Sequence, residues 1–250
     1  MSQLAALRKW VVIQAKLYLR EPVGVFFTLP FAPLLLVLMS LVFGNEPVAM
    51  FNGRGPLDVT VPTFAAIIVG LVGMMALPIE TASRRESGAL RRFRATPLRP
   101  LIYIIGDVLV YFFMVLLGVA LLFLVGIGVY HVQFEGRVLS LLAGVSLSAL
   151  AFLALGYVLA SLVPNAQVAA AVGNALYIPM TFLSGISVPL EVMPDAVRSV
   201  ARFVPLTSVV TLLRGLWFGD SFGDHVFEVA MLGGILVVGT VVAAWIFRWE

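Results

Sequence analysis

The sequence predicts an all-α membrane protein with six transmembrane helices. Of its 250 residues, 61% are hydrophobic and only 12% are charged, whereas soluble domains carry about 25% charged residues. Several uncharged apolar runs reach the length of about 20 residues that a helix needs to cross the hydrocarbon layer of a bilayer. These runs are continuous, and a membrane β-barrel would show alternation instead.

The ends of the apolar runs give the boundaries of the spans. The chain has no charged residue from Val138 to Leu190, which is too long for one span, and Pro164-Asn165 is the turn signal that divides this stretch. Pro100 suits the first turn of the third span, where its missing N–H costs nothing. The six expected spans are Val23–Phe43, Val59–Thr81, Leu101–Tyr130, Val138–Val163, Ala166–Leu183 and Val226–Phe247.

The N-terminal segment predicts a helix that lies in the plane of the membrane surface. On a helical wheel of residues 2–21, an apolar side faces a basic side, which suits a helix at the headgroup level. Pro22 then forces a break before the first span. We therefore divide the chain into an interfacial helix at 1–22 and one membrane domain at 23–250. The apolar side holds Leu4, Leu7, Val11, Ala15 and Tyr18, and the basic side holds Lys9, Lys16 and Arg20.

The distribution of basic residues gives the orientation. Eleven of the 16 Lys and Arg residues lie in the N-terminal segment, in the loop 82–100 and in the C-terminal tail. Loops rich in Lys and Arg remain in the cytoplasm. Six spans with both termini in the cytoplasm agree with this rule.

The arginine-rich loop also reads as a short cytoplasmic helix, at about 83–97. Ser83 and Glu86 have the spacing of a capping box, Leu90 and Phe93 form a small apolar edge, and Thr96-Pro97 stops the helix. The basic residues near the C-terminal end of this helix interact favourably with the helix dipole. The alternative is a plain positive anchor, which explains the charge but requires no capped helix. These basic residues are Arg91, Arg92 and Arg94.

The connection at about 184–225 predicts short helices at the outer face. Residues 194–204 form an amphipathic pattern, with Pro194 at the first helical position. Such a helix suits either a lid over the bundle or an exit for lipid-like cargo.

A few polar or helix-breaking residues near the spans are candidates for gating or for lining a pathway. Glu80 and Asp107 lie near the cytoplasmic ends of their spans, and we expect ion pairs with Arg84, Arg85 or Arg99, or a gating role. Glu228 opens the last span, where a helix N-terminus favours an acid. The other two candidates are Asn174 and Pro179, for which ordinary packing is the favoured interpretation and a substrate path or a dimer seam is the alternative.

Several kinds of site are excluded or disfavoured by composition. The chain has no cysteine, and its two histidines, His131 and His225, lie near the outer ends of spans, so we expect no metal site. Neither lysine follows a glycine, so no phosphate-binding loop is present. The motifs of intramembrane serine proteases and zinc proteases are also missing. We expect no cofactor on this chain, no enzymatic activity and no nucleic-acid partner.

Two segments carry a resemblance to a known family. Arg85-Glu86-Ser87-Gly88-Ala89-Leu90, followed by Thr96-Pro97-Leu98, resembles the coupling-helix region of ABC-2-type permeases, with Ala89 where threonine is common. Ser184-Gly185-Ile186-Ser187-Val188-Pro189 and the following Met193-Pro194 resemble the family's segment between its last two spans. The closest similarity is to the daunorubicin-resistance-like branch.

The resemblance implies the membrane subunit of an ATP-driven exporter in the plasma (inner) membrane of a prokaryote. Two copies, or one copy and a paralogue, would each dock a separate ABC ATPase, which binds the ATP and Mg²⁺. The cargo would be a hydrophobic drug, a lipid or a lipid-linked glycan. An ion-gradient-driven carrier or channel is the alternative. The implied ATPase-coupling residues are Arg85, Glu86, Gly88, Leu90, Arg91, Arg92, Phe93 and Arg94.

Overall fold

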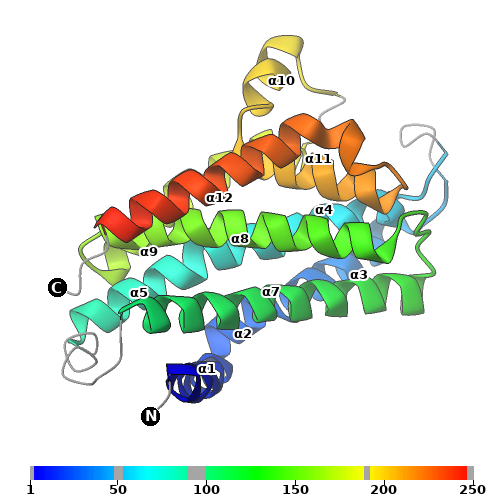
Figure 1. Cartoon of the computed structure of the whole chain (residues 1–250). Helices are drawn as coiled ribbons and strands as arrows, with labels where there is room; N and C mark the ends of the chain where they lie inside the picture. Colours follow the sequence, from blue (N-terminus) through cyan, green and yellow to red (C-terminus); the bar gives the residue numbers. More distant parts are fainter. Residues whose placement is uncertain (1–2, 48–52, 89–99, 189–191, 247–250) are drawn as a thin grey trace.

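The computed structural model describes residues 3–47, 53–88, 100–188 and 192–246, and their regular structure is helical (Figure 1). This confirms the predicted all-α fold class. The helices are α1 (Gln3–Leu19), α2 (Pro22–Thr28), α3 (Phe31–Phe43), α4 (Pro56–Leu71), η2 (Val72–Ala76), α5 (Leu77–Glu86), α7 (Pro100–Tyr130), α8 (Val138–Leu162), α9 (Ala166–Leu183), α10 (Asp195–Ala201), α11 (Pro205–Trp217), η4 (Phe222–His225) and α12 (Val226–Ile246).

Five helical stretches of the described chain are long and apolar enough to cross a membrane, and two bent helix pairs qualify only when each pair is counted as one span. The bent pairs are α2–α3, with an angle of 50°, and α10–α11, with an angle of 93°. Counting α2–α3 as the first span gives the predicted six. Counting the α10–α11 pair as a span as well would give seven, so the six-span layout itself stays a prediction.

Most span boundaries agree with the sequence, and two differ. The predicted first span is one helix, but the structure breaks it at Leu29-Pro30, because Pro30 cannot continue the preceding helix. The predicted second span ends at Thr81, but helix continues to Glu86. By contrast, α9 has the predicted limits Ala166–Leu183.

Helix α1 lies across the bundle. Figure 1 shows it almost end-on, below α2 and α7, while the long helices run across the picture. Its buried face packs on α7: Trp10 fills the space beside Gly106 and donates from Nε1 to the Tyr103 carbonyl at 3.2 Å. Tyr18 meets Tyr111 edge-on at 5.4 Å between ring centroids. Lys9, Lys16 and Arg20 are exposed, as the wheel predicts.

Helices α4, η2 and α5 form one long buried element at the centre of the bundle. Its π-helical turn, η2, crosses α8 closely, because glycines from both helices meet there. A side chain at Gly73 would touch the Phe152 backbone at 2.8 Å, and one at Gly156 would strike the Gly73 carbonyl. The absence of a Cβ at both positions allows the two backbones to approach.

The segment between α9 and α12 was predicted as a polar connection with short helices at the outer face. Among the described residues of this segment, the α-helices α10 and α11 and the 3-10 helix η4 form, but α11 is buried against α4, α8 and α12. Trp217 at its end is fully buried and donates to the Gln133 carbonyl at 2.9 Å. Helix α10 instead stands off the side of the bundle, with Val197 and Val200 exposed (Figure 1).

Candidate functional site

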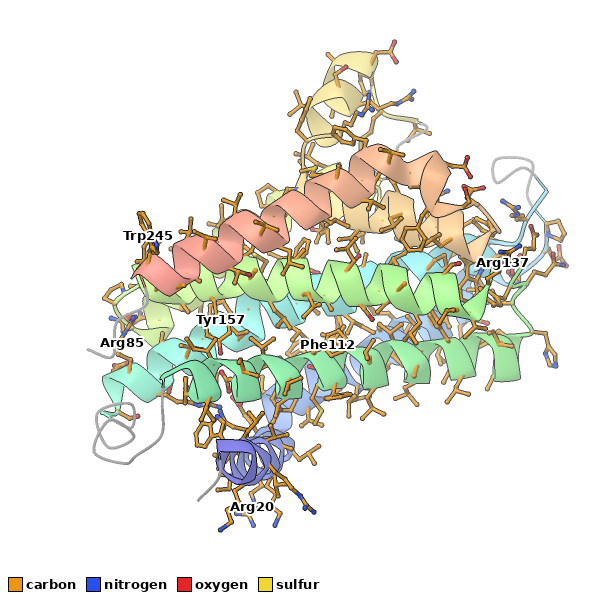
Figure 2. All side chains as sticks on the ribbon, viewed as in Figure 1. Arg20, Arg85, Phe112, Arg137, Tyr157 and Trp245 are labelled. Carbon is orange, nitrogen blue, oxygen red and sulfur yellow. The ribbon has the colours of Figure 1, made fainter. Side chains whose placement is uncertain are left out.

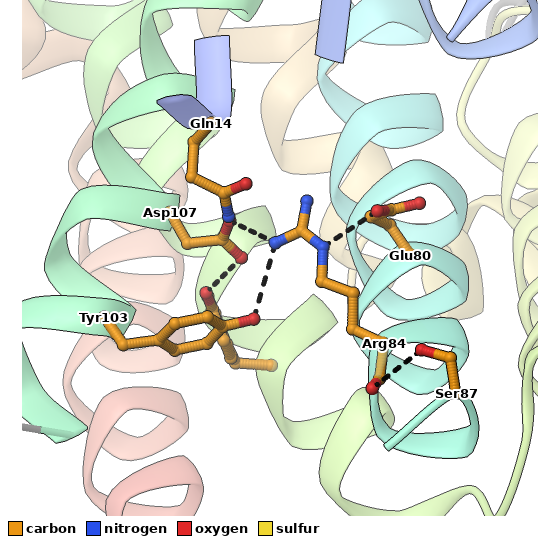
Figure 3. Close-up of polar contacts among 7 residues, drawn as sticks. Gln14, Glu80, Arg84, Ser87, Tyr103 and Asp107 are labelled. Carbon is orange, nitrogen blue, oxygen red and sulfur yellow. Dashed lines mark hydrogen bonds and ion pairs between the residues drawn. The ribbon is translucent and has the colours of Figure 1, made fainter. Parts of the chain in front are cut away.

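A buried polar cluster joins α1, α5, α7 and α8 near the cytoplasmic end that the sequence predicts. Asp107 of α7 lies at its centre and is 1% exposed. Arg84 of α5 donates from Nη1 to Asp107 Oδ1 at 2.9 Å, and the Tyr157 hydroxyl donates to Oδ2 at 2.8 Å. The side-chain amide of Gln14 donates to Oδ1 as well (Figure 3). The Asp107 carboxylate thus accepts hydrogen bonds from side chains of three other helices.

Arg84 has a second acid as partner. Its Nε donates to Glu80 at 2.8 Å, and its Nη1 lies 3.4 Å from the Tyr103 hydroxyl (Figure 3). The expected ion pairs of Glu80 and Asp107 with Arg84 are therefore confirmed. Charges in a membrane protein interior are costly unless they are paired, so this cluster makes the polar segment of α5 compatible with burial.

The predicted helix start at Ser83 is wrong. Ser83 lies inside α5, whose last residue is Glu86, and Gly88 has a positive φ of 69° just beyond it. The capping pattern is overridden because Arg84 and Arg85 find partners on neighbouring helices, which extends the helix of the second span. Leu90, Arg91, Arg92, Phe93 and Arg94 lie outside the described residues.

The end of α5 holds the turn between α8 and α9. Arg85 donates from Nη2 to the carbonyl of Val163, the first residue after α8. Glu86 accepts from the N–H of Ala166, the first residue of α9, at 3.4 Å. Figure 2 shows Arg85 at one end of the bundle and Arg137 at the other. The beginning of the predicted coupling segment therefore contacts two further spans.

An apolar cavity of about 400 Å³ lies beside the polar cluster, between α2, the α4–η2–α5 element, α7 and α9. Tyr18 and Thr28 close one wall with a 2.5 Å hydrogen bond between their hydroxyl groups. Tyr177 of α9 donates to the Ile67 carbonyl at 3.2 Å. Among the predicted pathway residues, Asn174 lines this cavity.

The other two pathway candidates lie elsewhere. Pro179 is exposed on α9 and does not line the cavity. Glu228 lines a separate pocket beside α10, and its Oε2 lies 3.8 Å from His225 Nδ1. The structure thus places Glu80 and Asp107 in one polar cluster and Asn174 in the neighbouring cavity, while Pro179 and Glu228 lie apart from both.

Sequence reasoning missed several residues of the site. Gln14 and Trp10 of α1 are buried, although neither was among the residues of the predicted apolar side. The amide of Gln14, which falls on that side of the wheel, was the available signal. Tyr157 lies in an uncharged span, where a buried hydroxyl requires a partner. Tyr18 was placed only on the apolar side of the N-terminal helix, but burial raises the pKa of this tyrosine to about 12, so it remains a neutral hydrogen-bonding group.

Comparison with known proteins identifies the fold. The family model described as "ABC-2 type transporter" matches residues 8–218, which include the polar cluster, the cavity and α11. The chain belongs to the ABC-2 type transporter family. This confirms the resemblance carried by the two motifs, and it makes the chain a multi-pass membrane protein.

Two curated proteins illustrate the relationship within the ABC-2 family. The probable multidrug ABC transporter permease YbhS of Escherichia coli K12 is 26% identical over 162 residues, which is 64% of this chain and 43% of YbhS. Nodulation protein J of Rhizobium leguminosarum bv. viciae is 28% identical over 104 residues, which is 42% of this chain and 40% of that protein. The chain thus aligns with less than half the length of each.

Proposed function

We propose that this chain is the membrane-spanning permease subunit of an ATP-driven exporter for hydrophobic or amphipathic cargo. A separate ABC ATPase would supply the energy, with its ATP and Mg²⁺. The observation that carries the proposal is the position of α5 in a chain of the ABC-2 family. This helix leads directly into the arginine-rich segment and is bonded to α7, to the residue after α8 and to the start of α9.

The contacts of α5 suit the transmission of movement. A push on residues 83–97 by an ATPase would act on Arg85 and Glu86 first, and then on Arg84. Because Arg84 and its partner Asp107 are hydrogen-bonded to α1, α7 and α8, displacement of α5 would move these helices together. Leu90 and Phe93 would seat in the ATPase, while Glu86, Arg91, Arg92 and Arg94 would fix the register by charge.

The cavity supports an apolar cargo. Its walls are formed mainly by aliphatic and aromatic side chains, and ligand pockets of about 300–1,000 Å³ with a few polar groups are typical of small-molecule sites. The relative YbhS is described as a multidrug permease, which agrees with a drug-like cargo, while lipids and lipid-linked glycans fit the same walls. A second copy or a paralogue would complete the pathway. The chain would lie in the plasma membrane with both of its termini in the cytoplasm.

The arginine-rich segment gives the direct test. Changing Arg91 and Arg92 together to Glu should release the co-purifying ATPase and reduce ATP-dependent export at least tenfold, because the charge that fixes the contact is reversed. The measurement is a mild-detergent pull-down of the chain with an ATPase assay, followed by transport into inside-out vesicles.

The control is Arg137→Glu, which reverses one arginine charge at the end of the bundle opposite Arg85 (Figure 2). It should leave the ATPase bound. Export that persists in the double variant, or that collapses with the proton gradient at constant ATP, would instead favour an ion-gradient-driven carrier.

A further inference from the structure

The cavity beside the polar cluster has an acidic rim. Glu21, in the connection between α1 and α2, is the one charged side chain among the described residues that line it. The remaining lining groups are aliphatic, aromatic, hydroxyl or amide. An anion at the edge of an otherwise uncharged cavity selects ligands by the sign of their charge.

Nearby positive charge does not neutralise this rim. The Glu21 carboxyl lies near that of Glu80, whose negative charge repels it. Glu80 and Asp107 already share Arg84, at 2.8 and 2.9 Å. Two carboxyl groups therefore already pair with this guanidinium, and Glu21 is the carboxyl that faces the cavity.

The surroundings of Glu21 favour a second cation or a proton. Partial burial and, next, the neighbouring Glu80 raise the pKa of Glu21 above its usual range, against the smaller lowering by Arg84. A bound cation would offset both effects, because its attraction to the carboxylate compensates for the lost hydration and for the repulsion by Glu80.

The walls suit a cation that is itself apolar. Tyr18, Tyr111 and Tyr177 present aromatic rings to the cavity, together with Phe27. Aromatic faces attract cations within about 6 Å of the ring centre, most strongly where water is excluded. A small hydrated ion would lose its water without finding the oxygen ligands it needs, whereas a large organic cation carries little hydration.

From this geometry we infer that the cavity binds lipophilic monovalent cations, with Glu21 as the counter-charge and the aromatic rings as the walls. The inference rests on the proposed function, because it names the cargo class of the proposed pathway. It makes Glu21 the residue that distinguishes cationic from neutral or anionic cargo of the same size.

Tetraphenylphosphonium and tetraphenylborate give a direct test, since they have nearly the same shape and opposite charge. Binding of each to the full chain in phosphatidylcholine nanodiscs would be measured by equilibrium dialysis, with empty nanodiscs subtracted. We expect tetraphenylphosphonium to bind at least tenfold more tightly. Glu21→Gln should weaken tetraphenylphosphonium binding about tenfold. Glu21→Asp keeps the charge and should retain most of the affinity.

Glu46→Gln is the matched control, because Glu46 is exposed and does not line the cavity. It should leave both affinities unchanged. Equal affinity for the two ions, or a Glu21→Gln protein that folds normally and binds tetraphenylphosphonium as the unaltered chain does, would overturn the inference.

Lowering the pH should weaken the binding of tetraphenylphosphonium, as Glu21→Gln does. The titratable groups around Glu21 and its cavity are Tyr18 of α1, Glu80 and Arg84 of α5, Tyr111 of α7 and Tyr177 of α9, with Asp107 of α7 paired to Arg84. Protonation of Glu21 removes the counter-charge, so tetraphenylphosphonium affinity should fall as the pH drops through its raised pKa. This pH dependence should disappear in Glu21→Gln, and its persistence there would assign the effect to another group.

The binding test is independent of the ATPase, so the two proposals can fail separately. If the cation binds through Glu21 but no ATP-dependent export of any cargo is found, the exporter proposal fails alone. If export is found and responds to Arg91 and Arg92 but ignores the charge of the cargo, the inference fails alone.

Discussion

Replacing Asp107 with alanine should destabilise the protein by about 3–5 kcal/mol, because removing one partner of a buried ion pair leaves the other charge insufficiently compensated. Arg84 would keep Glu80 and the Tyr103 hydroxyl, and the Tyr157 hydroxyl and the Gln14 amide would lose Asp107 as an acceptor. Since these groups lie on four different helices, we expect loss of the packing between α1 and the bundle. The measurement is the apparent melting temperature of the purified chain in detergent.

The design of the series separates charge from size. Asp195→Ala is the control, because that side chain is fully exposed on α10. Asp107→Asn should be milder than Asp107→Ala, since the amide still accepts a hydrogen bond. The double change of Arg84 and Asp107 to Leu should be less harmful than the sum of the single changes. Similar melting of Asp107→Ala and Asp195→Ala would show that the cluster does not hold the helices together.

Gly156→Ala should cost about 3 kcal/mol or more, the upper end of the range for overpacked positions. The added methyl group would meet the carbonyl oxygen of Gly73, which is backbone and cannot turn aside as a side chain can. Helix α8 would have to move away from η2 along the buried centre of the bundle. Size-exclusion profiles and melting curves in detergent would measure the effect.

Gly128→Ala is the matched control for this substitution. It adds the same methyl group to a glycine of α7 that has no neighbouring atom within 4 Å of the new position. Alanine also favours helix over glycine, so we expect unchanged or slightly raised stability. Equal behaviour of the two variants would mean that α8 and η2 are not held at close approach.

The sequence predicts the features that depend on hydropathy and on short-range turn chemistry. The limits of α9 follow from the uncharged run and from Asn165, whose side chain caps the helix by accepting from the Val168 N–H at 2.9 Å. The pairing of Glu80 and Asp107 with arginine follows because isolated charges are unfavourable near a membrane interior.

Features that depend on contacts between distant segments were not predictable in this way. Ser83 and Glu86 have a capping pattern, but long-range bonds from Arg84 and Arg85 outweigh that local preference. The burial of α11 depends on the space left between α4, α8 and α12, which no local pattern encodes. The cavity is formed by helices from both halves of the chain, so its acidic rim emerges only in the folded bundle.

The π-helical turn at Val72–Ala76 has a consequence for the length of this segment. A π turn holds about one residue more than an α turn, and one residue corresponds to a rotation of about 100° around the helix axis. The side on which Glu80 and Arg84 emerge is thus fixed by the number of residues upstream, although η2 itself contains only apolar side chains and glycine. Substitutions of one small apolar residue for another in η2 keep its length, so Glu80 and Arg84 still leave the helix on the same side. Deletion of one residue would turn Arg84 away from Asp107.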